Sequence, residues 1–219
     1  TKNLLELAKK NKALFLHAST SEVYGRVSSS TTEEFPMNPI NPYGVSKAAA
    51  DLYVRERAKS ENLLFFVTRA FSHTGPRRGK QFSISSDAYQ IARIVKGLQK
   101  PEIKVGKLES KRVIVDVRDC VAAYANLMDG KFISGEAYNV GGDEIYSIGE
   151  VLDMMLEMRG LKEEVKIVRD EGLVRKIGFG IQIPDSTKCR QVTGWSPKIP
   201  IKQTLSDLLT YWENKVGSE

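Results

Sequence analysis

The chain has 219 residues, of which 41% are hydrophobic and 27% charged, and it contains two cysteines and two histidines. No apolar run approaches the ~20 residues that a membrane-spanning helix needs, and no signal peptide is recognisable. Cys120 and Cys189 lack the CxxC spacing of a metal or redox site. The net charge of +6 is interspersed with acidic residues, which favours a small anionic ligand over nucleic acid. Composition therefore predicts a cytoplasmic protein with reduced thiols and no metal.

Strand and helix signals alternate along the chain. Short apolar runs predict strands, and apolar residues at helical spacing predict helices, beginning with an amphipathic segment near residue 5. The predicted strands are 13–17, 63–69 and 136–140, and the predicted helices are 43–60, 84–98, 120–128, 148–158 and 201–212. This alternation predicts an α/β fold.

The first predicted strand leads into the sequence Ser-Thr-Ser-Glu-Val-Tyr-Gly at residues 19–25. Thr20 and Glu22 therefore follow the carboxyl end of a buried strand. Open α/β sheets bind their ligands at this edge. The sequence predicts that a hydroxyl and a carboxylate lie at a ligand-binding edge.

A second polar pair begins the next predicted helix. Asn41 suits the position that caps a helix, and Tyr43 and Lys47 lie four residues apart, so they share one helical face. A free tyrosine has a pKa of about 10, and a nearby ammonium favours its phenolate. The pair is therefore suited to proton transfer near neutral pH.

Together these motifs resemble the extended short-chain dehydrogenase/reductase family, whose members act on nucleotide-activated sugars with a tightly bound NAD or NADP that is regenerated. The resemblance covers nearly the whole chain and implies a Rossmann-like doubly wound parallel sheet with a smaller α/β substrate-binding lobe. It implies that Tyr43 takes a proton from the C4 hydroxyl of the sugar and that Thr20 hydrogen-bonds the C4 oxygen. Lys47 would lower the pKa of Tyr43 and, with Tyr43, contact the cofactor.

Glu22 bears on which reaction of the family is expected. By resemblance, the 4,6-dehydratases use a carboxylate to remove the C5 proton and eliminate water across C5 and C6, whereas simple 4-epimerases need no such base. The nucleotide-sugar decarboxylases also carry Ser-Glu-Val-Tyr-Gly, so Glu22 narrows the reaction without fixing it.

The run Phe-Ser-His-Thr-Gly-Pro-Arg-Arg-Gly at residues 71–79 resembles the Asn-His-x-x-Pro-Arg-Arg-Gly stretch of GDP-mannose 4,6-dehydratases and related GDP-6-deoxy-hexulose reductases. The resemblance implies that His73 and Arg78 contact the cofactor. Ser72 replaces the asparagine that usually reaches the diphosphate of the substrate, and its shorter side chain leaves that contact to water or backbone.

Two further arginines match substrate-binding positions of the family. Arg112 corresponds to an arginine that binds the nucleotide phosphates, for which the forked guanidinium is suited, although Val113 replaces the usual acidic neighbour. Arg175 corresponds to the arginine of an Arg-Pro-x-Asp signature whose proline and aspartate are absent here. Asp116 and Asp119 flank a predicted helix start and are interpreted as structural caps.

A dinucleotide-binding unit also needs a glycine-rich turn, yet Gly25 and Gly44 are the only glycines before the 71–79 run. The glycine-rich βαβ unit is therefore expected outside this chain, which alone should be inactive. Residues 1–71 are assigned to the remainder of the dinucleotide-binding domain and 72–219 mainly to the substrate-binding lobe, with 112–140 returning to the sheet.

The favoured interpretation is an enzyme resembling GDP-mannose 4,6-dehydratase, with GDP-mannose as substrate and neither nucleic acid nor membrane as partner. A homodimer or homotetramer is expected through the Tyr-x-x-x-Lys helix, where Ala48, Ala49, Ala50 and Leu52 suit close helix packing. The alternatives are a 4-epimerase, a decarboxylase, a GDP-4-keto-6-deoxyhexose reductase, or a non-catalytic fragment that binds a nucleotide-sugar.

Overall fold

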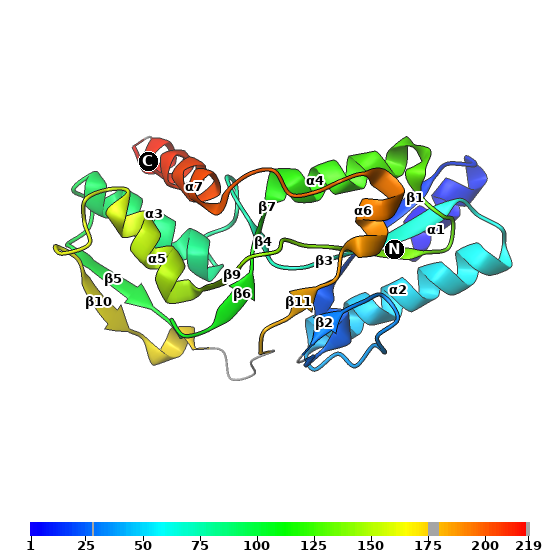
Figure 1. The fold of residues 1–219 in the computed structure, drawn as a ribbon, viewed down its shortest axis with the longest axis horizontal. Helices are drawn as coiled ribbons and strands as arrows, with labels where there is room; N and C mark the ends of the chain where they lie inside the picture. The colour runs from blue at the N-terminus through cyan, green and yellow to red at the C-terminus, as the bar shows by residue number, and fades with distance from the viewer. Residues whose placement is uncertain (28, 175–179, 218–219) are drawn as a thin grey trace.

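A computed structural model describes residues 1–27, 29–174 and 180–217, which form a larger and a smaller lobe side by side (Figure 1). The larger lobe is built on a parallel sheet with the strand order β1-β3-β8. Its strands are β1 (Phe15–Thr20), β3 (Phe65–Ala70) and β8 (Ala137–Val140). All six residues of β3 are buried, as expected for a central parallel strand with both faces covered.

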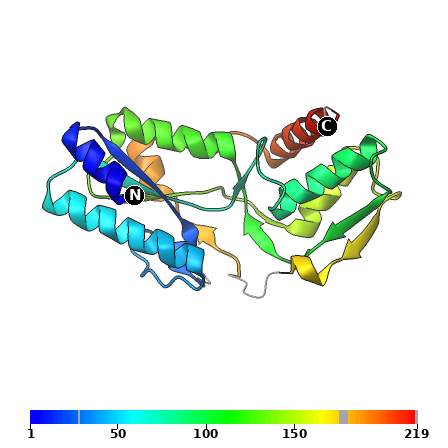
Figure 2. The ribbon, with the colours of Figure 1, turned by 180° about the vertical axis from the view of Figure 1, so that it is seen from behind.

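Helices cover both faces of this sheet. One face carries α1 (Lys2–Lys10) and α2 (Pro42–Ser60), which lie side by side in Figure 2, and the other carries α4 (Val117–Asn126) and α6 (Thr187–Thr193). Leu5 of α1 and Val54 of α2 pack on Phe65, whereas Phe66 points to the opposite core with Cys120 of α4. Because neighbouring side chains of β3 point to opposite faces of the sheet, this strand packs against both helical layers of the larger lobe.

The smaller lobe packs three helices over a pair of parallel strands. They are α3 (Ser83–Val95), α5 (Ile148–Glu157), α7 (Ile201–Val216), β5 (Glu102–Val105) and β10 (Lys166–Arg169). Its core is formed by apolar side chains such as Ile91, Leu152 and Leu208, none more than 1% exposed. Leu205, Leu209 and Trp212 are also buried and form the apolar stripe by which α7 packs on this core.

Short strands and turns connect the two lobes. The strands are β2 (Ser30–Thr31), β4 (His73–Thr74), β6 (Lys111–Val113), β7 (Val115–Asp116), β9 (Ile145–Ser147) and β11 (Ile183–Pro184). They pair as β4–β7, β6–β9 and β2–β11. Three short helical turns complete the elements: η1 (Ser21–Tyr24), η2 (Leu127–Lys131) and η3 (Glu171–Leu173).

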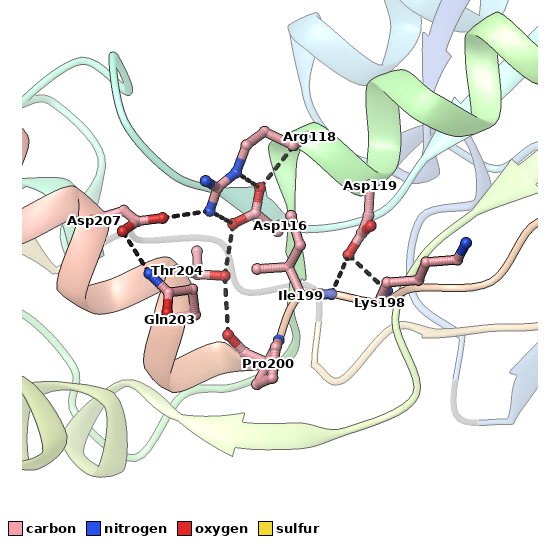
Figure 3. Close-up of polar contacts among 9 residues, drawn as sticks. All are labelled: Asp116, Arg118, Asp119, Lys198, Ile199, Pro200, Gln203, Thr204 and Asp207. Carbon is pink, nitrogen blue, oxygen red and sulfur yellow. Dashed lines mark hydrogen bonds and ion pairs between the residues drawn. The ribbon is translucent and has the colours of Figure 1, made fainter.

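Asp116 links the larger lobe to the last helix of the smaller lobe (Figure 3). Its carboxylate caps α4 by accepting from the backbone N–H of Arg118 at 2.7 Å and also accepts from the Thr204 hydroxyl of α7 at 2.7 Å. Burial alone would raise the pKa of Asp116, but the bonds from Arg118 and Thr204 hold it below its usual value. Arg118 continues the contact by pairing with Asp207 at 2.7 Å.

Asp119 fixes the chain that leads into α7 (Figure 3). One of its carboxylate oxygens accepts from the backbone N–H groups of Lys198 and Ile199, at 3.0 and 2.9 Å. The Asp119 backbone carbonyl accepts from the indole N–H of Trp195 at 2.9 Å. Asp116 therefore caps the helix as the sequence predicted, whereas Asp119 is structural in another way, because it holds the segment that leads into α7.

The α/β fold with its parallel sheet is confirmed, whereas most element boundaries differ from the sequence prediction by one to four residues, and two of the differences have a clear cause. The first strand extends to Thr20, because the polar residues after His17 still pair with β3. The helix predicted from Cys120 begins at Val117, because Asp116 caps it. Within the described residues, every helix is too short or too polar to span a bilayer.

Candidate functional site

The segment after β1 forms the tight turn that carries Glu22. Thr20 caps this turn, and its hydroxyl accepts from the backbone N–H of Glu22 at 3.3 Å. The turn ends at Gly25, whose φ is 70°, and a Cβ there would lie 1.9 Å from the carbonyl oxygen of Asn38. Only glycine tolerates that conformation and that approach. We call residues 20–25 the catalytic turn, after the role that is proposed for it below.

The start of α2 is joined directly to this turn. Asn41 caps the helix by accepting from the backbone N–H of Gly44 at 2.6 Å, and its amide donates to a Glu22 carboxylate oxygen at 2.8 Å. Gly44 approaches the turn closely, since a Cβ there would lie 2.8 Å from the Glu22 carbonyl oxygen. One asparagine thus sets both the first turn of α2 and the orientation of the Glu22 carboxylate.

Tyr43 and Lys47 follow on α2, one helical turn apart. The Tyr43 side chain is half exposed, and the Lys47 ammonium donates to the carbonyl oxygen of Ala18 on β1 at 2.9 Å. This bond places the positive charge of Lys47 beside the end of β1, two residues before Thr20. The structure therefore places Thr20, Glu22 and Lys47 near the carboxyl end of β1. Tyr43 is exposed one helical turn before Lys47, whereas Thr20 is buried and Glu22 and Lys47 are partly exposed.

His73 and Arg78 form a second group, beyond the end of β3. The His73 Nδ1 lies 2.9 Å from the carbonyl oxygen of Phe71, so Nδ1 carries the proton, and Nε2 faces a guanidinium nitrogen of Arg78 at 3.5 Å. Burial lowers the pKa of His73 and keeps the imidazole neutral at physiological pH. The guanidinium also stacks on the Phe82 ring, 3.6 Å from its centre.

The predicted substrate-binding residues lie on separate segments. Ser72 is exposed beside His73, and its backbone carbonyl accepts from Val115 at 3.1 Å. Arg112 lies on β6 and donates to the carbonyl oxygens of Lys111, at 2.6 Å, and Gly180, at 3.4 Å. Arg175 lies outside the described residues.

Sequence reasoning missed two contacts that hold the catalytic turn. The first is the bond from Asn41 to Glu22, since only the helix-capping role of Asn41 was predicted. The second is made by Gln182, whose side chain bonds to Ser21 and Gly25 from far along the chain. No local pattern marks either contact. In the part of the chain that the structure describes, no group of acidic, histidine or cysteine side chains could hold a metal ion.

The fold and these motifs define an extended short-chain dehydrogenase/reductase. A family model described as GDP-mannose 4,6 dehydratase matches residues 1–208, and the chain belongs to this family. It is 34% identical to GDP-6-deoxy-D-mannose reductase of Pseudomonas aeruginosa, over 100% of the chain and 73% of that protein. It is 26% identical to GDP-mannose 4,6 dehydratase 2 of Arabidopsis thaliana, over 84% of the chain and 49% of that protein.

Solved structures agree with this assignment. RMD from Pseudomonas aeruginosa complexed with NADPH superposes with a TM-score of 0.89 at 33% identity, over 98% of the chain and 72% of that structure. dTDP-glucose 4,6-dehydratase from Bacillus anthracis in complex with NAD gives 0.82 at 27% identity, over 98% and 66%. The chain thus spans between about half and three quarters of the length of these relatives.

Proposed function

We propose that the full-length protein transfers a proton and a hydride at C4 of a nucleotide-linked hexose. The observation that supports this proposal is that the bonds of Asn41 to Glu22 and of Lys47 to the Ala18 carbonyl join the start of α2, which carries Tyr43, to the carboxyl end of β1, which carries Thr20. The accessible phenol and ammonium suit the ribose and nicotinamide of NAD or NADP, which supplies hydride acceptance and return when bound. His73 and Arg78 are the further residues that would hold it.

The described residues divide the proton chemistry among them. Lys47 holds its ammonium at the end of β1, one helical turn from Tyr43. Tyr43 takes the proton of the C4 hydroxyl, while the Thr20 hydroxyl donates to the C4 oxygen. Arg112 binds the diphosphate, and Ser72 leaves room for water beside it. Arg175, which lies outside the described residues, is assigned to the same diphosphate only by its match to the family's arginine.

The particular reaction we propose is 4,6-dehydration of GDP-mannose. The bond from Asn41 holds the Glu22 carboxylate at the site, where a base is needed only if the C5 proton is removed. Once C4 is a ketone, Glu22 takes the C5 proton and passes it to the departing C6 hydroxyl, which leaves as water. Hydride is then delivered to C6 and a proton to C5, so the product is the 4-keto-6-deoxy sugar and no net oxidant is consumed.

The test uses the full-length enzyme with GDP-mannose in deuterated water. The wild type should form the 4-keto-6-deoxy product with deuterium at C5. Tyr43→Phe should lose C4 oxidation, whereas Glu22→Gln should still reduce cofactor in a single turnover but form ~10²-fold less product, as expected on losing a general base. Absence of product from the wild type, or an unchanged rate in Glu22→Gln, would refute dehydration.

A second candidate is reduction of a GDP-linked 4-keto-6-deoxyhexose. It is favoured by the 34% identity, over the whole chain, to the Pseudomonas aeruginosa reductase. This reaction uses Tyr43 as the proton donor to the C4 oxygen and needs no base at Glu22. Consumption of NADPH or NADH with the keto sugar, unaffected by Glu22→Gln, would identify it.

We also propose a homo-oligomer formed through the outer face of α2. Val45 and Leu52 are more than half exposed on that face, whereas Ala48 is buried against the chain's own core and is not available to a partner. Charged substitution at Leu52 should shift the sedimentation coefficient of the full-length protein to that of a monomer. An unchanged coefficient would place any interface elsewhere.

A further inference from the structure

Gln182 makes three hydrogen bonds to the catalytic turn although 157 residues or more separate it from that turn in sequence. Its side-chain oxygen accepts from the Ser21 hydroxyl at 2.7 Å. Its amide nitrogen donates to the carbonyl oxygens of Gly25, at 2.8 Å, and Ser21, at 3.1 Å. These bonds lie on either side of Glu22 and span the length of the turn.

The chemistry of the partners fixes the orientation of the Gln182 amide. Two backbone carbonyl oxygens can only accept, so the nitrogen must face them, and the hydroxyl of Ser21 is then the donor to the oxygen. A carboxylate at position 182 would keep the bond from Ser21 and lose both donations. The site thus distinguishes glutamine from glutamate, which have nearly the same shape.

The segment that carries Gln182 is itself anchored on both sides. Downstream, β11 pairs with β2, and the backbone N–H of Asp185 donates to the Thr31 carbonyl at 2.9 Å. Upstream, the Gly180 carbonyl accepts from the Arg112 guanidinium at 3.4 Å. Gln182 therefore lies between the arginine assigned to the substrate phosphates and the turn that carries Glu22.

We propose that Gln182 is a positioning residue that holds the catalytic turn, with Thr20 and Glu22, in the geometry for proton transfer. This inference rests on the proposed function only for its effect on the rate. Gln182 contacts the turn and not the proposed reacting atoms, so its loss acts through the turn. Turnover should then fall while the KM for the nucleotide-sugar changes little, because the phosphate contacts remain.

The test compares two variants of the full-length protein with a matched control. Gln182→Met keeps the length of the side chain without its polar atoms, and Gln182→Glu keeps the acceptor without the donor. The control is Gln203→Met, which removes a surface bond to Asp207 on α7. Hydrogen–deuterium exchange of the peptide covering residues 20–27 reports the turn directly, and steady-state kinetics with GDP-mannose, or with the keto sugar, reports kcat and KM.

Both Gln182 variants should exchange faster in this peptide than the wild type and should lose about tenfold in kcat, the effect of one or two net hydrogen bonds. Gln203→Met should match the wild type in both. Unchanged exchange in the Gln182 variants, or faster exchange with unchanged kcat, would overturn the positioning role. Wild-type protein inactive on every nucleotide-sugar would instead refute the proposed function, and the exchange result would still decide whether Gln182 holds the turn.

Discussion

The larger lobe buries charged groups beneath α2, whereas the core of the smaller lobe is built from apolar side chains. Asp51 of α2 and Arg69 of β3 are 0% and 1% exposed and form two bonds, at 3.0 and 3.2 Å. In the smaller lobe, the aliphatic side chains of the core, such as Leu152 and Leu208, make non-directional contacts. Apolar packing holds elements close together, but directional bonds also set their orientation.

The buried pair belongs to a network that reaches the catalytic turn. Arg69 donates to the Tyr24 hydroxyl at 2.9 Å, and Tyr24 donates to the Asn139 side chain of β8 at 2.8 Å. Burial raises the pKa of Tyr24 to about 12, so the phenol remains a donor throughout the physiological range. Tyr24 belongs to the catalytic turn, which also contains Glu22. The comparison of the two lobes indicates that directional bonds fix the orientation of side chains most closely where the proposed chemistry takes place.

Substitution of Arg69 by methionine should have the largest effect on stability. It leaves the Asp51 carboxylate buried without its partner, and breaking a buried pair in this way costs roughly 3–5 kcal/mol. Urea unfolding of the full-length protein measures the loss. Adding Asp51→Leu should restore most of it, because an apolar replacement of the whole pair is often neutral.

Arg57 provides the matched control for Arg69. It lies on the same helix as Asp51, but it pairs at the surface with Glu61 and Glu6. Arg57→Met should therefore leave unfolding nearly unchanged. If Arg69→Met cost no more than Arg57→Met, the buried network would not stabilise the larger lobe as argued.

Leu208→Ala tests the apolar side of the comparison. Leu208 is fully buried on α7, and truncation of such a leucine costs about 3 kcal/mol through lost contacts and the cavity left behind. Because no directional bond joins the core of the smaller lobe to the catalytic turn among the described residues, kcat measured well below the unfolding transition should remain near the wild-type value. Leu98→Ala, at a position 49% exposed, is the control. A fall in kcat as large as that of Gln182→Met would contradict the separation of roles.

Much of the fold was predictable because its signals are local. The apolar runs of the strands, the helical spacing of Tyr43 and Lys47, and the cap positions of Asn41 and Asp116 all depend on neighbouring residues in sequence. These signals set the elements, and the order of strands and helices then set the fold class. The motifs at the strand ends indicated the protein family, which the match of the family model to residues 1–208 confirms.

The contacts that hold the site were not predictable in the same way. Gln182 and Ser21 are 161 residues apart, and Arg69 and Tyr24 are 45 apart. The local sequence around these four residues does not distinguish them from polar residues at the surface. Each of them meets its hydrogen-bond partner only when distant segments of the chain pack together. A single sequence therefore reveals candidate reactive side chains more readily than the residues that position them.

The last prediction concerns the pH dependence of the free energy of unfolding, through Asp87, which is a buried acid in the smaller lobe. Burial raises its pKa from an ordinary 3.8 to about 7, so the folded state binds a proton that the unfolded state has lost. The stability that this proton contributes is complete below about pH 4 and is lost as pH rises through 7. Asp87→Asn should therefore stabilise the protein relative to the wild type more at pH 8 than at pH 4, because the amide never has to be buried as an anion. Urea unfolding at both pH values measures this, with the exposed Asp153→Asn as control. A variant with the same pH dependence as the wild type would show that the Asp87 carboxyl is not responsible for that dependence.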